Sequence, residues 1–430
     1  MLTAPVHIDS TEGPDLPLLS SPMTDRSTIL VNVHGPDHPG ISAGLMDVLS
    51  AGDAEIFDVE QIVVRGRLNL SVLIGVSTER STIADLLYFG WSEGLAIDFE
   101  VVDSNPTPIK EMSVVTVLGV RVGPDHFGAV ARAIADGGGN IERIFRLSRY
   151  PVLSYELVIS GGDIDLIRAK LVDAAARRPI DVAIQPGGLE RRSRRLVVLD
   201  VDSTLIQDEV IDLLAQEAGV ADQVAVITRA AMSGEVDFEQ SLRERVALLE
   251  GLDGEALQRV TAAITLTPGA RTFVRTLRRL GIKSAIVSAG FTRFTTAIAG
   301  ELGVDYSLSN TLDVQGGKLT GRLAGELVDG PRKARFLRDL AAAEGISPAQ
   351  VVAVGDGAND LEMLAAAGLG IAFNAKPVVV DRADTSVTVP FLDAILFLMG
   401  ISRDQIEAAD AADQTFVQAP LIEVPGTPPI

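Results

Sequence analysis

The chain has 430 residues, of which 47% are hydrophobic, and its 58 acidic and 37 basic residues give a formal net charge of −21. This length allows about two to four domains. The acidic balance disfavours partners such as nucleic acid or an anionic membrane. The absence of cysteine excludes disulfides and cysteine-ligated metals, and the chain has too few histidines for a histidine-rich metal site: His7, His34, His38 and His126. No apolar run reaches the length of a membrane span and the N-terminus lacks a signal-peptide pattern, so we expect a cytoplasmic protein that uses carboxylate chemistry.

A repeated motif organises the first part of the chain. Residues 1–26 are polar and contain several prolines, which predicts a flexible leader. Beyond it, Gly35-Pro-Asp-His-Pro-Gly40 and Gly123-Pro-Asp-His-Phe-Gly128 each follow a strand-like segment. In both copies a helix, further strands, a second helix and a closing strand come next, so the pattern β-α-β-β-α-β occurs twice and predicts two ferredoxin-like units. The helices and later strands are expected at 41–49, 68–76, 82–93 and 97–102, and at 130–135, 154–159, 163–176 and 180–184.

These two units, residues 27–104 and 110–186, resemble the ACT family of small-molecule regulatory domains. The resemblance implies that they bind an amino acid near the first loop and that they pair, which predicts a homodimer. The effector-site candidates are Gly35, Asp37, Gly123, Asp125 and Asn140. Turn chemistry offers an alternative for each of them, because Gly and Pro favour a tight strand-to-helix loop without any ligand. For His38 and His126 we expect surface-loop or capping roles.

The composition changes after the second unit. Residues 187–195 contain the basic run Glu190-Arg-Arg-Ser-Arg-Arg195. Because the net charge argues against nucleic acid, this segment is predicted to be a solvated linker.

From residue 196 onward the pattern predicts a parallel sheet with helices. Leu196-Val-Val-Leu is typical of a strand buried on both faces, and it ends in Asp200-Val-Asp202-Ser-Thr. Residues from about 206 to 266 are amphipathic and predict a helical lid over the crevice at the sheet edge. Two further apolar strands end in Ser288-Ala-Gly290 and Gly355-Asp356-Gly-Ala-Asn359-Asp360. The later elements are expected at 282–287, 308–310, 318–323, 351–354, 361–367, 370–373 and 391–399, with a helix opened by Asp329-Gly-Pro-Arg-Lys333, the domain ending near 408 and a flexible tail over 409–430.

These polar residues fall where open α/β sheets bind their ligands, at the carboxyl ends of strands. Alternation along the first strand predicts that Asp200 and Asp202 point the same way. Together with Asp356 they would repel one another unless a cation lies among them, and oxygen-only ligands favour Mg²⁺. Ser288 and Lys333 suit the charge of a phosphoryl group, and a carboxylate can attack phosphorus. The residues alone therefore predict Mg²⁺-dependent phosphoryl transfer and leave the substrate open.

Taken in order, Asp200-x-Asp202, Ser288, Lys333 and Gly355-Asp356-Gly-x-Asn359-Asp360 resemble the motifs of the haloacid dehalogenase superfamily of phosphatases. The resemblance implies that Asp200 is the nucleophile and that Asp202 is first the general acid and then the general base. It implies that Mg²⁺ is held by Asp200, the backbone carbonyl of Asp202, and Asp356. It assigns phosphoryl contacts and support to Ser288, Ala289, Gly290, Lys333, Asn359 and Asp360. Ala289 departs from the glycine common at that position, so its backbone N–H can serve only if its conformation suits a Cβ.

The predicted lid narrows the substrate. Asp200-Val-Asp-Ser-Thr-Leu-Ile-Gln-Asp-Glu209 and Phe238-Glu-Gln-Ser-Leu-Arg-Glu-Arg245 are similar to segments of the phosphoserine phosphatase family. This implies hydrolysis of O-phospho-L-serine through an aspartyl-phosphate, the last step of L-serine biosynthesis, with L-serine as the expected effector. Glu209 would meet the substrate ammonium, Arg245 its carboxylate, and Phe238 would form an apolar wall.

Other interpretations of these residues stay open at this point. Glu209 is also explained by the first turn of a helix, and Arg245 by an ordinary helix surface. Ser288 would also be explained as a helix cap, and Arg332 or Arg335 could replace Lys333 at the phosphate. The alternatives for the whole chain are a phosphatase of the same fold for another phosphomonoester, and an amino-acid sensor with a vestigial phosphatase.

Overall fold

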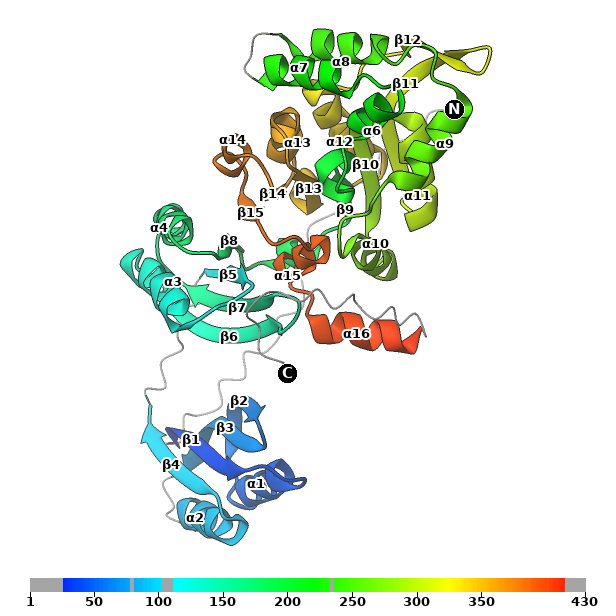
Figure 1. Ribbon diagram of the computed structural model, residues 1–430. Coiled ribbons are helices and arrows are strands. Elements are labelled where there is room, and N and C mark those ends of the chain that lie inside the picture. The colour runs from blue at the N-terminus through cyan, green and yellow to red at the C-terminus, as the bar shows by residue number, and fades with distance from the viewer. Residues whose placement is uncertain (1–25, 78–80, 103–110, 233–235, 414–430) are drawn as a thin grey trace, which may run out of the picture. The chain divides into compact units, whose positions relative to one another are not determined.

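The computed structural model describes residues 26–77, 81–102, 111–232 and 236–413. Two compact units make up the chain, Met1–Ile109 and Lys110–Ile430 (Figure 1). The predicted leader, apart from Arg26, and the segment from 414 onward lie outside the described residues. Within the described ranges, no helix combines the length and the apolar character needed to cross a bilayer.

The first unit has the β-α-β-β-α-β order that the repeat predicts. Its four strands form one antiparallel sheet in the order β2-β3-β1-β4. Ile29, Val31 and Val33 alternate along β1 and share a core with Leu45 of α1 and Leu86 of α2, so both helices pack on the same face. The other elements leave the edge strand β2 exposed along its whole length. The bounds are β1 Arg26–Pro36, α1 Ile41–Ala51, β2 Glu55–Val64, β3 Arg67–Ser77, α2 Ser81–Glu93 and β4 Ala96–Val101.

The second unit begins with the same fold, with strand order β6-β7-β5-β8. The repeated motif differs in structure between the copies. Gly35 lies in β1 and helix α1 begins only at Ile41, whereas Gly123 caps α3 and Pro124 is its first residue. Pro39 accounts for the difference, because a proline keeps the residue before it out of the helical region, and the second copy has phenylalanine there. The bounds are β5 Met112–Gly119, α3 Pro124–Asp136, β6 Asn140–Ser148, β7 Leu153–Ser160, α4 Ile164–Ala176 and β8 Asp181–Pro186.

The rest of the second unit is built on a seven-stranded sheet in the order β12-β11-β10-β9-β13-β14-β15. The strand predicted to be buried on both faces is β9, at the centre of the sheet. Leu196 and Val198 pack in the core on one face of the sheet, and Val197 and Leu199 pack in the core on the other face. Neighbouring strands are parallel, apart from the antiparallel hairpin of β11 and β12. Sequence reasoning missed β15, which extends the sheet beyond β14. The bounds are β9 Leu196–Leu199, β10 Lys283–Phe291, β11 Tyr306–Gln315, β12 Lys318–Ala324, β13 Val351–Gly355, β14 Leu369–Phe373 and β15 Thr385–Val387.

Helices cover both faces of this sheet. Phe273 of α10 and Phe294 of α11 pack in the core on one face, and Leu337 of α12 and Met363 of α13 in the core on the other. Four helices, α6 to α9, occupy the segment predicted to be a lid (Figure 1). The bounds are α6 Val210–Glu217, α7 Ala221–Met232, α8 Phe238–Ala247, α9 Gly254–Ala263, α10 Ala270–Arg279, α11 Thr292–Leu302, α12 Gly330–Ala343, α13 Leu361–Ala366, α14 Pro377–Val380, α15 Ile395–Leu398 and α16 Arg403–Ala412, with short 3₁₀ turns at Pro348–Gln350, Ala358–Asp360 and Leu392–Ala394. The mixed α/β fold class is as predicted.

The second ferredoxin-like domain and the seven-stranded sheet share one hydrophobic core. Leu118 and Ala183 of the domain belong to the same buried cluster as Leu398 of α15. The Gln185 side chain donates a hydrogen bond of 2.9 Å to the Leu398 carbonyl oxygen. Apolar burial on this scale is the dominant favourable term in folding, so the two parts are expected to be joined firmly.

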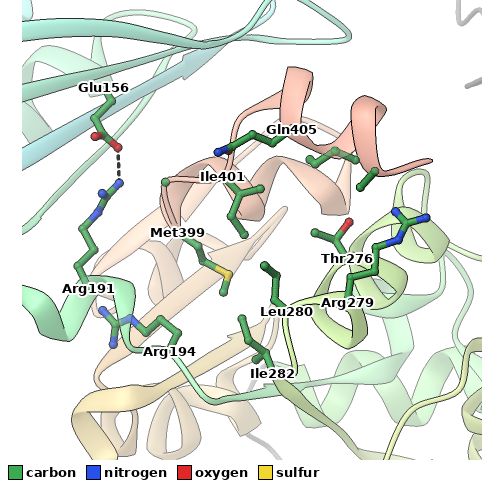
Figure 2. A pocket seen from close by; sticks show the side chains of 13 residues that line it. Glu156, Arg191, Arg194, Thr276, Arg279, Leu280, Ile282, Met399, Ile401 and Gln405 are labelled. Carbon is green, nitrogen blue, oxygen red and sulfur yellow. Dashed lines mark hydrogen bonds and ion pairs between the residues drawn. The ribbon is translucent and has the colours of Figure 1, made fainter. Parts of the chain in front are cut away.

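Two segments, the predicted linker and the start of the predicted tail, differ from their predictions. Residues 187–195 contain a short helix, α5 Leu189–Arg192, and Arg191 is only 5% exposed, so the run is not a solvated hinge. The reason is an ion pair: Arg191 Nη2 lies 2.5 Å from Glu156 Oε2 in β7 (Figure 2). Helix α16 continues to Ala412, into the segment from 409 predicted to be a tail, because Asp410 pairs with Arg275 and Arg279 of α10.

Candidate active site

Asp200 and Asp202 follow β9 at the carboxyl edge of the sheet. The strand ends at Leu199 and the chain turns over Val201–Leu205, so the alternation argument does not extend to Asp202. Ser203 in this turn has φ 58°, a left-handed conformation that is unfavourable for a residue with a Cβ. The turn, rather than the strand, directs the two carboxylates to their partners.

Lys333 is the buried cation of the site. Its Nζ atom donates to Asp200 Oδ1 at 2.6 Å and to Asp360 Oδ1 at 2.7 Å, and its side chain is 0% exposed. Burial alone would lower the pKa of Lys333, but the charges of the two aspartates outweigh it and raise the pKa above the ordinary value. The neighbours Arg332 and Arg335 instead pair with a glutamate near the surface. The structure thus selects Lys333 among the three cations of the motif.

Three carboxylates lie close enough to hold one metal ion. Asp200, Asp356 and Asp360 each place an oxygen within 4.8 Å of the others. Burial, followed by the charge of Asp360, raises the pKa of Asp356 to about 6, and burial also raises the pKa of Asp200. Both shifts show that negative charge is unfavourable here, and a bound cation would reverse them. Oxygen donors of this kind fit Mg²⁺.

The Asp202 carboxylate is not part of that group. Its Oδ1 accepts a hydrogen bond of 2.8 Å from the backbone N–H of Val210, at the start of the lid, and its Oδ2 accepts one of 2.8 Å from Ser288 Oγ. Burial raises the pKa of Asp202, and these two hydrogen bonds oppose the rise. This agrees with a predicted ligand set that includes the backbone carbonyl of Asp202 but not its carboxylate.

The loop after Ser288 approaches Asp202 closely. The backbone N–H of Gly290 donates to Ser288 Oγ at 2.6 Å. A Cβ at Gly290 would lie 2.8 Å from Ser288 Oγ and 2.9 Å from Asp202 Oδ2, so a larger residue would displace these two side chains. Ala289 lies within strand β10, a conformation that accepts a Cβ. Its departure from the family glycine therefore requires no backbone strain.

Two residues of the lid segment carry ionisable groups near Asp202. Glu209, the residue before α6, accepts a hydrogen bond of 2.8 Å from Ser203 Oγ. Although the residue as a whole is exposed, partial burial of its carboxylate and the charge of Asp202 raise the pKa of Glu209 to about 7. Burial lowers the pKa of half-buried Arg245 on α8, and the charges of Glu209, Asp212 and Asp202 act in the opposite direction. Glu209 and Arg245 thus lie within electrostatic range of Asp202.

Phe238 and Asn359 are less closely tied to the aspartates. Phe238 is the first residue of α8 and packs partly against the large core. Asn359 lies in the 3₁₀ turn after β13, half-buried, and its Oδ1 would contact a Cβ placed on Gly357. The adjacent Asp360 accepts a hydrogen bond of 3.0 Å from the backbone N–H of Gly357 through Oδ2.

The effector-site candidates of the first domain have local structural roles. Gly35 is buried, and a Cβ there would lie 2.6 Å from Leu95 Cδ2. Asp37 is exposed, and its backbone N–H donates to the Gly66 carbonyl oxygen at 2.9 Å. Close packing therefore explains the glycine at position 35. The Asp37 side chain is exposed, so solvent or a ligand can reach it.

The second-domain candidates lie at a helix start and a strand start. The backbone N–H of Gly123 donates to His126 Nδ1 at 2.9 Å, which is the capping role expected for this histidine. Asp125 Oδ2 lies 3.5 Å from His126 Nε2. Asn140, at the start of β6, donates to Glu142 Oε1 at 3.0 Å.

Sequence reasoning missed Asn310, which joins two parts of the site. Its side chain is 2% exposed; Nδ2 donates to the Ala289 carbonyl oxygen at 2.7 Å, and Oδ1 accepts from the Val328 N–H at 2.8 Å. It therefore links the Ser288 loop to the segment that leads into α12 and Lys333. Only its position at the end of an apolar strand-like segment could have signalled it.

We expect Asn310→Ala to lower the stability of the second unit by about 1 to 3 kcal/mol, because it leaves the Ala289 carbonyl and the Val328 N–H buried without partners. Catalytic turnover should fall with it, because the change loosens both the loop after Ser288 and the segment that leads into Lys333. Urea denaturation and steady-state kinetics measure the two effects. Gln315→Ala is the control, because Gln315 is exposed on the same strand β11, and this change should alter neither quantity.

Comparison with known proteins agrees with this geometry. Residues 197–365 match the haloacid dehalogenase-like hydrolase family, and residues 27–100 and 112–185 match ACT domain families. The phosphoserine phosphatase of Streptomyces coelicolor is 50% identical over 397 residues, covering 91% of this chain and 96% of that protein. Phosphoserine phosphatase SerB2 of Mycobacterium tuberculosis is 45% identical over 403 residues, covering 91% and 97%. A crystal structure of a probable phosphoserine phosphatase from Vibrio cholerae, in unliganded form, is similar with a TM-score of 0.54 at 35% identity, covering 70% of this chain and 89% of that one.

The parallel sheet with aspartates at its carboxyl edge, together with the two N-terminal domains, defines a haloacid dehalogenase-like hydrolase that carries two ACT domains. Identity of 45 to 50% over 91% of its length is more specific. The chain belongs to the phosphoserine phosphatase family.

Proposed function

We propose that this enzyme hydrolyses O-phospho-L-serine to L-serine and phosphate, the last step of L-serine biosynthesis in the cytoplasm. The observation that carries the proposal is the pair Glu209 and Arg245, one carboxyl group and one guanidinium from the lid within electrostatic range of Asp202. A phosphorylated amino acid presents an ammonium and a carboxylate beside its phosphate. A carboxylate and a planar guanidinium are the groups that recognise them.

In the proposed reaction Asp200 Oδ attacks phosphorus, and the bond from phosphorus to the serine oxygen breaks. Asp202 gives its proton to that oxygen, and L-serine leaves. Asp202 then takes a proton from the water that attacks the aspartyl-phosphate, which releases phosphate and restores Asp200. The contact of Asp202 with both the lid and Ser288 supports this role, since it lies between the substrate-binding and phosphate-binding groups.

The phosphoryl oxygens would be bound by Ser288 Oγ, the N–H groups of Ala289 and Gly290, and Lys333. The ammonium of Lys333 has three donors, and two of them bond to Asp200 and Asp360. Asp200, Asp356 and the carbonyl of Asp202 would hold Mg²⁺, which supplies charge neutralisation for the phosphoryl group when bound. Asp360 would fix the position of Lys333, and Asn359 would contact phosphate or water.

Steady-state hydrolysis of O-phospho-L-serine, compared with sugar phosphates and nucleotides, tests the substrate. We expect a higher kcat/KM for O-phospho-L-serine than for the other phosphate esters. Hydrolysis should be lost when Mg²⁺ is removed with a chelator. A higher kcat/KM for a sugar phosphate would contradict the substrate while leaving the phosphatase chemistry intact.

Arg245→Met should raise KM for O-phospho-L-serine by about tenfold to 100-fold, because a charge-assisted contact with the substrate carboxylate is lost. Hydrolysis of p-nitrophenyl phosphate, which has no amino-acid group, should be nearly unchanged. Arg243→Met is the matched control, since Arg243 lies on the same helix but is exposed and pairs with Glu239. Equal losses on both substrates would contradict the role of Arg245.

We also propose that the ACT domains bind an amino acid, with L-serine as the expected effector, and mediate a homodimer. The exposed edge strand β2 supports the second part, because Phe57, Ile62 and Val64 are 50%, 58% and 56% exposed. Unpaired strand edges with apolar side chains readily pair with another chain. Ile62→Lys should shift the mass seen by light scattering from dimer to monomer, and a monomeric wild-type protein would contradict the proposal.

Calorimetry with L-serine tests the proposed effector. Absence of L-serine binding would contradict the proposal that the ACT domains bind this amino acid.

A further inference from the structure

Three hydrogen bonds join the turn after β9 to the start of the lid. The backbone N–H of Ser203 donates to the Asp208 carbonyl oxygen at 3.3 Å, and Ser203 Oγ donates to Glu209 Oε1 at 2.8 Å. In the third bond, the backbone N–H of Val210 donates to Asp202 Oδ1. The first residues of the lid are therefore held against the same turn that carries the Asp202 carboxylate.

The backbone of Ser203 has a conformation that serine rarely adopts. Its φ of 58° lies in the left-handed region, where glycine is favoured and a Cβ is unfavourable. A residue with a Cβ persists in such a conformation only when its surroundings hold it there, and such residues cluster at functional sites. Glycine would remove the strain but also the hydroxyl group, so the backbone alone does not explain a serine at this position.

The carboxylate of Glu209 is not used to stabilise its own helix. Glu209 is the N-cap residue of α6, but its side chain makes no capping hydrogen bond. In the described part of the chain only Ser203 donates to this carboxylate, through Oε1, so Oε2 can accept from a substrate ammonium. Burial and the charge of Asp202 raise the pKa of Glu209 to about 7, and the hydrogen bond from Ser203 acts in the opposite direction, because it favours the charged form.

We propose that Ser203 is a positioning residue for substrate recognition: its hydroxyl group holds the Glu209 carboxylate in the orientation that binds the substrate ammonium. A hydrogen bond that fixes the rotatable bonds of the glutamate side chain in advance removes part of the entropy cost of binding. The inference rests on the proposed function, since it takes Glu209 as the group that meets the ammonium. It adds the residue that prepares Glu209 for this contact.

Ser203→Ala tests the proposal by steady-state kinetics. We expect KM for O-phospho-L-serine to rise by about tenfold, the value of one hydrogen bond to a charged group, while kcat changes much less. KM for p-nitrophenyl phosphate, which has no ammonium, should not rise. Thr265→Ala is the matched control, because it removes an exposed hydroxyl group from the segment that returns from the lid and should leave both KM values unchanged. An unchanged KM for O-phospho-L-serine, or equal increases for both substrates, would overturn the proposal.

Ser203→Gly separates this role from a general loosening of the turn. Glycine accepts the left-handed conformation without strain, so the midpoint of thermal unfolding should not fall. KM for O-phospho-L-serine should nevertheless rise as it does in Ser203→Ala, because the hydroxyl group is absent. A KM equal to that of the parent enzyme would show that only the backbone conformation matters and would refute the role of the hydroxyl group.

A double-mutant cycle with Glu209→Ala distinguishes a failure of this inference from a failure of the proposed function. If Ser203 acts through Glu209, Ser203→Ala should raise KM no further once the Glu209 carboxylate has been removed. A further rise of about tenfold would show that Ser203 acts by another route, and only the inference would be wrong. An unchanged KM for Glu209→Ala by itself would contradict the binding role of Glu209, and both the proposed substrate recognition and the inference would then fail.

Discussion

Asp200→Asn is expected to lower kcat for O-phospho-L-serine by about four orders of magnitude or more, because an amide cannot form the aspartyl-phosphate. The fold should tolerate the change. Burial already raises the pKa of Asp200, so a neutral side chain of the same shape is acceptable at this position. Asn can also accept the hydrogen bond from Lys333 through its side-chain oxygen. Phosphate release under saturating substrate and Mg²⁺ measures the loss.

Circular dichroism of the same preparation provides the control, because an unaltered spectrum and unfolding midpoint separate lost chemistry from lost structure. Asp381→Asn on the surface, after the short helix α14, is the matched substitution and should leave kcat unchanged. Substantial residual turnover by Asp200→Asn would remove Asp200 as the nucleophile. It would then point to direct attack by water on phosphorus, with neither the nucleophilicity nor the charge of a carboxylate at position 200 required.

Lys333→Met is expected to remove activity and also to destabilise the second unit by about 3 to 5 kcal/mol, the cost of leaving buried charges without their partner. The reason is the position of Nζ between Asp200 and Asp360, with the lysine side chain fully buried. Methionine keeps most of the apolar length of lysine, so packing changes little. Urea denaturation in metal-free buffer, followed by circular dichroism, measures the stability effect.

Arg335→Met on the same helix is the control. Arg335 is 57% exposed and pairs with an exposed glutamate, so its loss should cost at most about 1 kcal/mol. Lys333→Met with native-like stability would show that the aspartates become protonated or bind another cation without penalty. Lys333→Met with native-like activity would remove Lys333 from the phosphate site.

Local pattern was enough to predict most of the fold. The continuous apolar run from Leu196 to Leu199, the repeated Gly-Pro-Asp loop and the helical periodicity of the lid each depend on neighbours within a few residues along the chain. The candidate aspartates could be found for the same reason, since they directly follow apolar strands. Short strands without a strong pattern were harder: β15 has only three residues, Thr385–Val387, and is held by its parallel neighbour β14.

The motifs and their order, from Asp200 to Asp360, can be found in the amino-acid sequence. How those motifs meet depends on the folding of the whole domain. Local pattern could not separate Lys333 from Arg332 and Arg335, and only the family resemblance favoured Lys333, because the burial of a helix residue depends on the sheet against which the helix packs. Asn310 acquires its role only where two loops distant in sequence approach. The charge of Arg191 predicts a solvated side chain when only its sequence neighbours are considered. Its partner Glu156 lies 35 positions away along the chain and contacts it only in the folded protein.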